Sequence, residues 1–146
     1  MTYIYTPKGK AREYSPYALN IYIGCDHGCQ YCYVPGIAKH KNIYPRVDPK
    51  KLDAELKKNR PNERVLLCFM TDPYNHLDVE KKLTRQTLEV LLQHDVPISV
   101  LTKGGKRSLR DHDLLCSFTD VQYGITAVFE DEAERALMEP SAAPTS

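Results

Sequence analysis

Residues 65–103 read VLLCFMTDPYNHLDVEKKLTRQTLEVLLQHDVPISVLTK, and this stretch decides the fold. The apolar runs at 65–70 and 98–102 are short and nearly continuous, which is typical of strands buried in a parallel sheet. Between them an apolar stripe recurs at helical spacing and ends at Asp95, ahead of Pro97. Its members are Val79, Leu83, Leu88, Leu91 and Leu92, with Asp78 as the expected N-cap. The stretch therefore predicts a strand, a crossover helix and a second strand.

The same alternation continues on both sides of this unit. Apolar runs at 18–23 and 121–128 predict two more strands, and helices are expected at 49–59, 108–116 and 131–138. Asp48 followed by Pro49 is a common helix start, and Ser108 with Asp111 can open the next helix. The order predicts an α/β fold of about four βα units, with a parallel sheet and helices packed outside it.

In parallel sheets, both open sheets and (β/α) barrels, functional sites lie at the carboxyl ends of the strands. The residues at these ends are Gly24-Cys25, Thr71-Asp72, Thr102-Lys103 and the neighbours of Ala127. The first three pairs are polar and chemically specific, so we expect the functional site at this edge.

A cysteine motif follows the first predicted strand. Cys25, Cys29 and Cys32 have C-x3-C-x2-C spacing, so three soft thiolates can converge on zinc, copper(I) or an iron-sulfur cluster. A structural zinc ion needs a fourth ligand, for which His27 and His40 are the candidates. The other two cysteines, Cys68 and Cys116, lie within apolar patterns and are expected to be inert core residues. Spacing alone leaves zinc and iron-sulfur open.

Composition is that of a globular protein, with 42% hydrophobic and 27% charged residues among 146 and a net charge of +1. No apolar run approaches the roughly 20 residues that span a bilayer, so we expect a cytoplasmic protein with free thiols and no membrane contact. Charge is uneven: 39–64 holds nine Lys or Arg against four acids, whereas 130–139 holds five acids and Arg135. Solvated helix faces explain this better than a polyanion surface.

The motif C-x3-C-x-aromatic-C resembles the signature of the radical S-adenosylmethionine (SAM) superfamily, and the resemblance extends over nearly the whole chain. It implies that Cys25, Cys29 and Cys32 bind three irons of a 4Fe-4S cluster and that SAM chelates the fourth. It also implies reductive cleavage of SAM to a 5'-deoxyadenosyl radical that abstracts hydrogen. A flavodoxin or ferredoxin would supply the electron. The implied fold is a partial (β/α) barrel.

Further motifs resemble the branch related to spore photoproduct lyase. Thr71, Asp72 and Lys103 match positions that contact SAM, and Tyr31 matches the aromatic residue near the adenine. Tyr31 and Tyr33 also match tyrosines proposed to relay a hydrogen atom. The resemblance to this branch implies nucleic acid as a candidate partner, which the basic segment 39–64 could contact.

One departure argues against a direct lyase assignment, because Phe69 occupies the place of the lyase's hydrogen-donating cysteine. Cys68 is one residue away, and alternation along a strand would turn its side chain to the opposite face.

The resemblance also predicts the domain organisation. Residues 1–146 would form the N-terminal, incomplete portion of a radical SAM core, with four βα units of an expected six. Residues 1–17 would be an N-terminal extension and 140–146 a loop at a truncated end. The alternatives to an enzyme are a zinc-binding module and an inactive fragment. Substrate, product and oligomeric state are not predicted by any motif.

Overall fold

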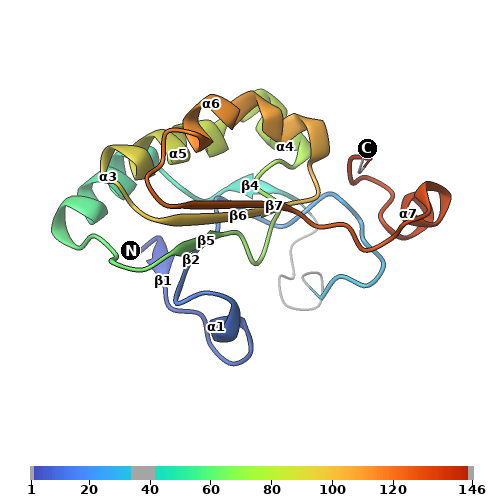
Figure 1. The fold of residues 1–146 in the computed structure, drawn as a ribbon, viewed down its shortest axis with the longest axis horizontal. Helices are drawn as coiled ribbons and strands as arrows, with labels where there is room; N and C mark the ends of the chain where they lie inside the picture. Colours follow the sequence, from blue (N-terminus) through green and yellow to red (C-terminus); the bar gives the residue numbers. More distant parts are fainter. Residues whose placement is uncertain (1, 34–41, 145–146) are drawn as a thin grey trace.

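The computed structural model describes residues 2–33 and 42–144, which form a main sheet with helices packed against it and a second, two-stranded sheet (Figure 1). Its elements, in chain order, are β1 (Ile4–Tyr5), α1 (Ala11–Tyr14), β2 (Tyr17–Leu19), β3 (Tyr22–Ile23), β4 (Tyr44–Pro45), α3 (Pro49–Lys58), β5 (Val65–Leu67), α4 (His76–Lys81), α5 (Leu83–Gln93), β6 (Ile98–Thr102), the 3-10 helix η1 (Gly105–Asp111), α6 (His112–Leu115), β7 (Val121–Ile125) and α7 (Glu132–Met138).

The main sheet has the strand order β1-β2-β5-β6-β7. β2, β5, β6 and β7 are parallel to one another, and β1 adds an antiparallel strand beside β2 at one edge. Figure 1 shows α3, α5 and α6 side by side on one face of this sheet, as right-handed crossovers between parallel strands require. The predicted α/β fold with a parallel sheet is confirmed, and β1 and β7 form the two edges of the sheet within the described residues.

The core fills the layer between the sheet and the helices. Leu67, Ile98 and Val100 of the strands are at most 2% exposed, and Leu88 and Leu91 of α5 are fully buried. α5 has leucines at helical spacing because one apolar stripe must cover the sheet while its other face stays in water.

The first predicted strand, 18–23, divides into two short strands. Tyr17 and Ala18 pair with β5 in the main sheet, whereas Tyr22 and Ile23 pair with β4 in a separate two-stranded sheet. The chain changes partner at Asn20, which is buried and donates from Nδ2 to the Tyr5 hydroxyl at 2.9 Å.

The second predicted strand ends early, at Leu67 instead of residue 70. Beyond it, the backbone N–H groups of Phe69 and Met70 donate to Asn20 Oδ1 at 3.1 and 3.0 Å, so a side chain replaces the neighbouring strand as their acceptor. β7 likewise ends at Ile125 and not at residue 128, while β6 has the predicted bounds.

Two helices agree closely with the sequence pattern. α3 begins after Asp48, whose carboxylate accepts hydrogen bonds from the N–H groups of Lys50 and Lys51, with Pro49 in the first helical position. α7 has Asp131 as its N-cap, which accepts from the Glu134 N–H. Local capping residues therefore set both N-termini.

The single helix predicted from Asp78 to Asp95 is wrong in two ways: the helix begins earlier, and it is broken into α4 and α5. Asn75 is the N-cap, and Asp78 lies inside α4 with its carboxylate 2.7 Å from Arg110 Nη2. Lys82 has a left-handed backbone, with φ of +50°, and separates α4 from α5. Val79 is exposed because this break turns α4 out of the α5 stripe.

The third predicted helix is also different. Residues 105–111 form η1, and Ser108 does not open a helix but is buried, with its hydroxyl donating to Gly105 O at 2.7 Å. Cys116 follows α6 and is exposed, so its assignment to the core is wrong. Within the described residues, no helix has the length and apolarity needed to cross a membrane.

Truncating Leu88 to alanine should lower the free energy of unfolding by about 2–5 kcal/mol, because the cavity opens between α5 and the sheet. Leu137→Ala, at a leucine that is 71% exposed, is the matched control and should change it by less than about 0.5 kcal/mol. Urea unfolding followed by circular dichroism measures both. An equal loss of unfolding free energy in the two variants would contradict the assignment of Leu88 to the core.

Candidate metal and cofactor site

The cysteine loop, residues 24–33, leaves β3 at the end of the molecule where the parallel strands terminate (Figure 1). Gly24 and Gly28 have φ of +81° and +66°, a left-handed conformation that favours glycine. A Cβ at Gly24 would also lie 3.0 Å from the carbonyl oxygen of Asn42. The Cys32 N–H donates to Cys29 O at 3.1 Å, which closes a turn between the last two cysteines.

Cys25, Cys29 and Cys32 are all free and half-buried. Burial raises the pKa of the Cys25 thiol to about 11, and burial followed by the Glu139 carboxylate raises the pKa of Cys29. Three soft donors on one loop fit an iron-sulfur cluster, and a bound cation would offset the burial of their negative charge. Within the described residues, no three His, Cys, Asp or Glu side chains are gathered closely enough to bind a metal. Cluster binding therefore requires the thiols to draw together.

Asp72, at the carboxyl end of β5, is 7% exposed and links two strand ends. Its Oδ1 accepts from the Tyr74 N–H at 2.8 Å and from the Thr102 hydroxyl at 2.6 Å. Its Oδ2 accepts from the Lys103 N–H at 2.7 Å. Both carboxylate oxygens are thus engaged by the protein, and the turn after β5 is fastened to the end of β6.

His27, in the middle of the cysteine loop, is 2% exposed and faces the same carboxylate. Its Nδ1 lies 3.7 Å from Asp72 Oδ2, and its Nε2 accepts from Arg107 Nη2 at 3.2 Å. Burial lowers the pKa of His27, which agrees with a neutral ring whose Nε2 accepts a hydrogen bond. Because the ring is buried and its Nε2 is bonded to Arg107, His27 is poorly suited to complete a zinc site. His40, the other zinc candidate, lies outside the described residues.

Lys103, Tyr31 and Glu139 meet beside Cys29. Lys103 Nζ lies 3.7 Å from Glu139 Oε1 and 5.7 Å from the centre of the Tyr31 ring, and the Tyr31 hydroxyl donates to Glu139. Glu139 is 2% exposed, and burial together with this carboxylate raises the pKa of Tyr31. Lys103, Tyr31 and Glu139 therefore form one polar cluster beside Cys29.

The remaining predicted residues lie around this centre. Thr71 is buried, with its hydroxyl 3.5 Å from Asp72 O, and the exposed Tyr33 donates from its hydroxyl to Phe69 O at 2.9 Å. Burial raises the pKa of Cys68, and the charges of Asp72 and Cys25 add to this effect. Cys68 is half-buried and packs against the hydrophobic core, as expected for a core cysteine.

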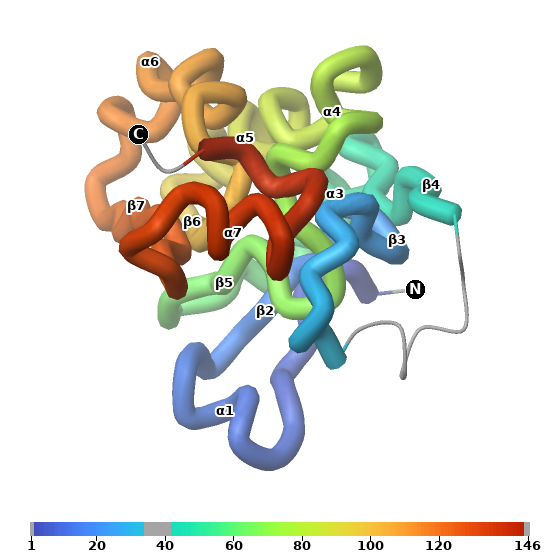
Figure 2. Tube along the Cα trace, turned by 90° about the vertical axis from the view of Figure 1, so that its right-hand side faces the viewer, coloured from blue at the N-terminus to red at the C-terminus, as the bar shows by residue number. Residues whose placement is uncertain are grey.

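The segment after α7 packs against the cysteine loop, although more than 100 residues separate them in sequence (Figure 2). The Gln30 N–H donates to Met138 O at 2.9 Å, and the Ser141 N–H donates to His27 O at 3.0 Å. The Pro140 ring lies 3.3 Å from the position of a Cβ at Gly28, which leaves little space for a side chain there. Residues 138–141 thus form one wall of the site.

The residues that sequence patterns did not identify are Asn20, His27 as a structural partner, and Arg107. Asn20 is a buried polar residue in an apolar run, which is the signal that could have marked it.

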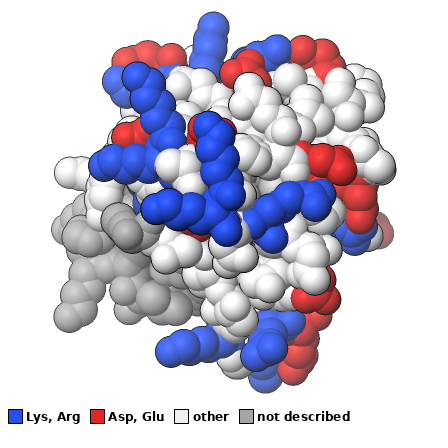
Figure 3. Space-filling view, turned by 90° about the vertical axis from the view of Figure 1, so that its left-hand side faces the viewer, with Lys and Arg blue, Asp and Glu red and all other residues white. Residues whose placement is uncertain are grey.

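The basic segment 39–64 is only partly described, and part of it, α3, lies toward the end of the molecule opposite the cysteine loop (Figure 1). Lys and Arg side chains gather on that opposite face, interspersed with acids (Figure 3).

The family model of the radical SAM superfamily matches residues 19–140. An uncharacterised protein of Methanocaldococcus jannaschii is 30% identical over 115 residues, which cover 75% of this chain and 43% of that protein. Uncharacterised proteins of Mycobacterium bovis and Mycobacterium tuberculosis are each 30% identical over 102 residues, covering 60% of this chain and 29% of theirs. The chain thus spans less than half the length of these relatives. No solved structure matches it at a significant level.

Asp72→Asn should lower the free energy of unfolding by about 1–3 kcal/mol, because an amide nitrogen would face a buried N–H or hydroxyl donor. Asp120→Asn, on a half-exposed carboxylate paired with Arg64, is the control and should cost less than about 1 kcal/mol. Chemical denaturation at pH 7 gives both values. If Asp72→Asn is as stable as the Asp120 variant, the carboxylate does not join the two strand ends.

Proposed function

Because the chain belongs to the radical SAM superfamily, we propose that it binds a 4Fe-4S cluster through Cys25, Cys29 and Cys32 and binds SAM beside it. The observation that carries this proposal is the loop of three free thiols held at the strand ends next to Asp72 and Lys103. When bound, the cluster supplies the electron for reductive cleavage of SAM to a 5'-deoxyadenosyl radical. The reaction that follows is lyase-like and acts on an unknown substrate.

Lys103 is the residue best placed to bind the carboxylate of SAM. Its ammonium group is half-buried, and Glu139 at 3.7 Å is its only acidic partner within hydrogen-bonding or ion-pairing range among the described residues. A compact ammonium can turn to a second carboxylate without losing the Asp72 contact, because that contact uses the Lys103 backbone N–H.

Asp72 and Thr71 differ in how many further hydrogen bonds their side chains can accept at this edge of the sheet. The Asp72 carboxylate already accepts three hydrogen bonds from the protein. We therefore assign it the role of positioning Lys103 and the turn after β5, rather than that of binding the SAM ammonium group directly. The Thr71 hydroxyl makes only a long contact, at 3.5 Å, and retains capacity to accept from that ammonium.

Tyr31 and Tyr33 are proposed to act on the substrate side of the cofactor. Both rings are about half exposed, and Tyr31 is held by Glu139 while Tyr33 is held by Phe69 O. Tyr31 is also assigned to the adenine of SAM, and a hydrogen-atom relay through the two hydroxyls extends the resemblance to spore photoproduct lyase. A flavodoxin or ferredoxin is the proposed electron donor, and nucleic acid is the weakest of the proposed partners.

The zinc-binding alternative is not favoured by the family match. It also loses a candidate ligand, because His27 is buried, its Nε2 bonds to Arg107 and its Nδ1 faces Asp72 at 3.7 Å.

Alanine at Cys29 should abolish cluster binding, because two thiolates leave a second iron without a protein ligand. Anaerobic reconstitution of the full chain followed by iron and sulfide analysis measures this, and the parent protein should be brown with about four irons per chain. Cys116→Ala, at an exposed cysteine away from the loop, is the matched control and should retain the iron.

Two outcomes would contradict the cluster assignment. One is an iron content in Cys29→Ala equal to that of Cys116→Ala. The other is colourless parent protein that carries stoichiometric zinc after purification without chelators.

A further inference from the structure

A pocket of about 520 Å³ lies between the start of η1 and the segment that follows α7. One wall is the start of η1, with Gly104, Lys106 and Arg107, and the opposite wall is the segment 140–144; His76 of α4 also lines it. No acidic side chain lines the pocket. His76 faces a carboxylate that does not line the pocket, since its Nδ1 lies 3.1 Å from Asp26 Oδ2.

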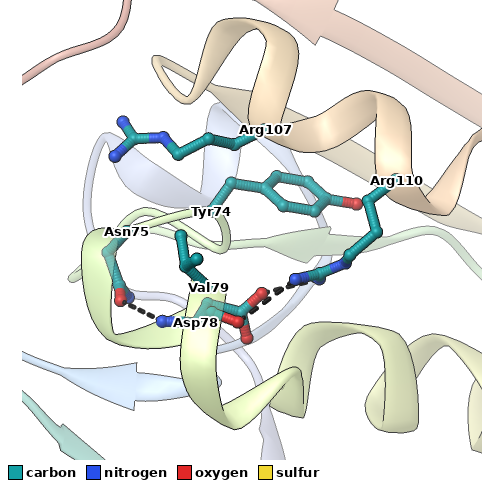
Figure 4. Close-up of a pocket in the computed structure, with 6 residues that line it drawn as sticks. All are labelled: Tyr74, Asn75, Asp78, Val79, Arg107 and Arg110. Carbon is teal, nitrogen blue, oxygen red and sulfur yellow. Dashed lines mark hydrogen bonds and ion pairs between the residues drawn. The ribbon is translucent and has the colours of Figure 1, made fainter.

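Arg107 has unused hydrogen-bond donors at this pocket. Of the five N–H donors of a guanidinium, one on Nε is given to Gly104 O at 3.2 Å and one on Nη2 to His27 Nε2 at 3.2 Å. Both acceptors are neutral, and among the described residues no carboxylate forms an ion pair with Arg107. Figure 4 draws a second pocket that Arg107 also lines: there Arg110 points at the Asp78 carboxylate, whereas Arg107 bonds to none of the other residues drawn.

Lys106 adds a second positive charge next to Arg107 in sequence. It is exposed, and no acidic partner lies within ion-pairing distance in the described part of the chain. Other arginines of the chain do have acidic partners: Arg85 and Arg110 pair with aspartates, and Arg135 pairs with Glu132. Two adjacent cations without counter-charges in a concave site favour an oxyanion ligand.

Both walls of the pocket are fixed by backbone contacts. A Cβ at Gly104 would lie 2.5 Å from Tyr74 Cβ, and one at Gly105, whose φ is +50°, would lie 2.8 Å from Ala143 Cβ. The Ala143 N–H donates to Lys103 O at 3.0 Å, and the Ser141 N–H donates to His27 O. The guanidinium therefore projects from a closely packed support, so little ordering is needed when a ligand binds.

We propose that this pocket binds the phosphate group of a small organic molecule, with Arg107 as the bidentate donor and Lys106 as the second charge. The volume exceeds that of the oxyanion alone and leaves room for an organic part. The proposal does not depend on cluster or SAM binding, because none of the cysteines lines the pocket. An occupant here would be linked to the cysteine loop through Arg107, which bonds to His27.

Isothermal titration calorimetry of the full chain with inorganic pyrophosphate at low ionic strength tests the proposal. Arg107→Gln should weaken pyrophosphate binding at least about tenfold, since a charge-assisted contact is lost, and Lys106→Gln should weaken it by a few fold. Arg12→Gln, at an exposed arginine on α1, is the matched control and should bind as the parent does. Circular dichroism and thermal melting check that each variant is folded.

Lys106→Glu extends the test at an exposed position where folding is not at risk, and it should abolish pyrophosphate binding. Equal affinities in the Arg107, Lys106 and Arg12 variants would overturn the proposal. So would a parent chain that binds a short single-stranded oligonucleotide in an Arg107-dependent manner but does not bind pyrophosphate, since the phosphate would then belong to a polynucleotide.

Discussion

The buried carboxylate of Asp72 is the contact on which the rest of the candidate site depends. It accepts from Tyr74, Thr102 and Lys103 and faces His27, so the turn after β5, the end of β6 and the cysteine loop meet at one side chain. Burying a carboxylate is costly unless its oxygens are satisfied, and three short hydrogen bonds meet that requirement. The functional edge of the sheet is therefore held by a polar centre, while the apolar core lies between the sheet and α5.

The cysteine loop takes its position from contacts distant in sequence and has little regular structure of its own. His27 anchors it to Asp72 and Arg107, and residues 138–141 hold it from the other side through Gln30 and the His27 carbonyl. The positive φ values of Gly24 and Gly28 let the chain turn tightly between these anchors. The thiols are thus kept near the strand ends without being gathered into a finished ligand set.

The parallel sheet, α3 and α7 follow from local signals, because apolar runs and capping residues act within a few residues of the chain. The shortened strands and the broken α4–α5 helix do not, since they depend on long-range partners: Asn20 accepts the N–H groups that would have extended β5, and Asp78 faces Arg110 instead of capping. At the site, the cysteines, Thr71, Asp72 and Lys103 were recognisable from motifs. The roles of His27, Glu139 and Arg107 required the fold to bring residues 27, 107 and 139 together.

The most direct test of a radical SAM protein with an open iron is electron paramagnetic resonance of the reconstituted, reduced full chain with and without SAM. The account predicts the signal of a reduced 4Fe-4S cluster whose g values and line shape change when SAM is added, because SAM binds the iron that no cysteine holds. A cluster signal that SAM leaves unchanged would contradict it, as would the absence of any cluster signal in a correctly folded protein.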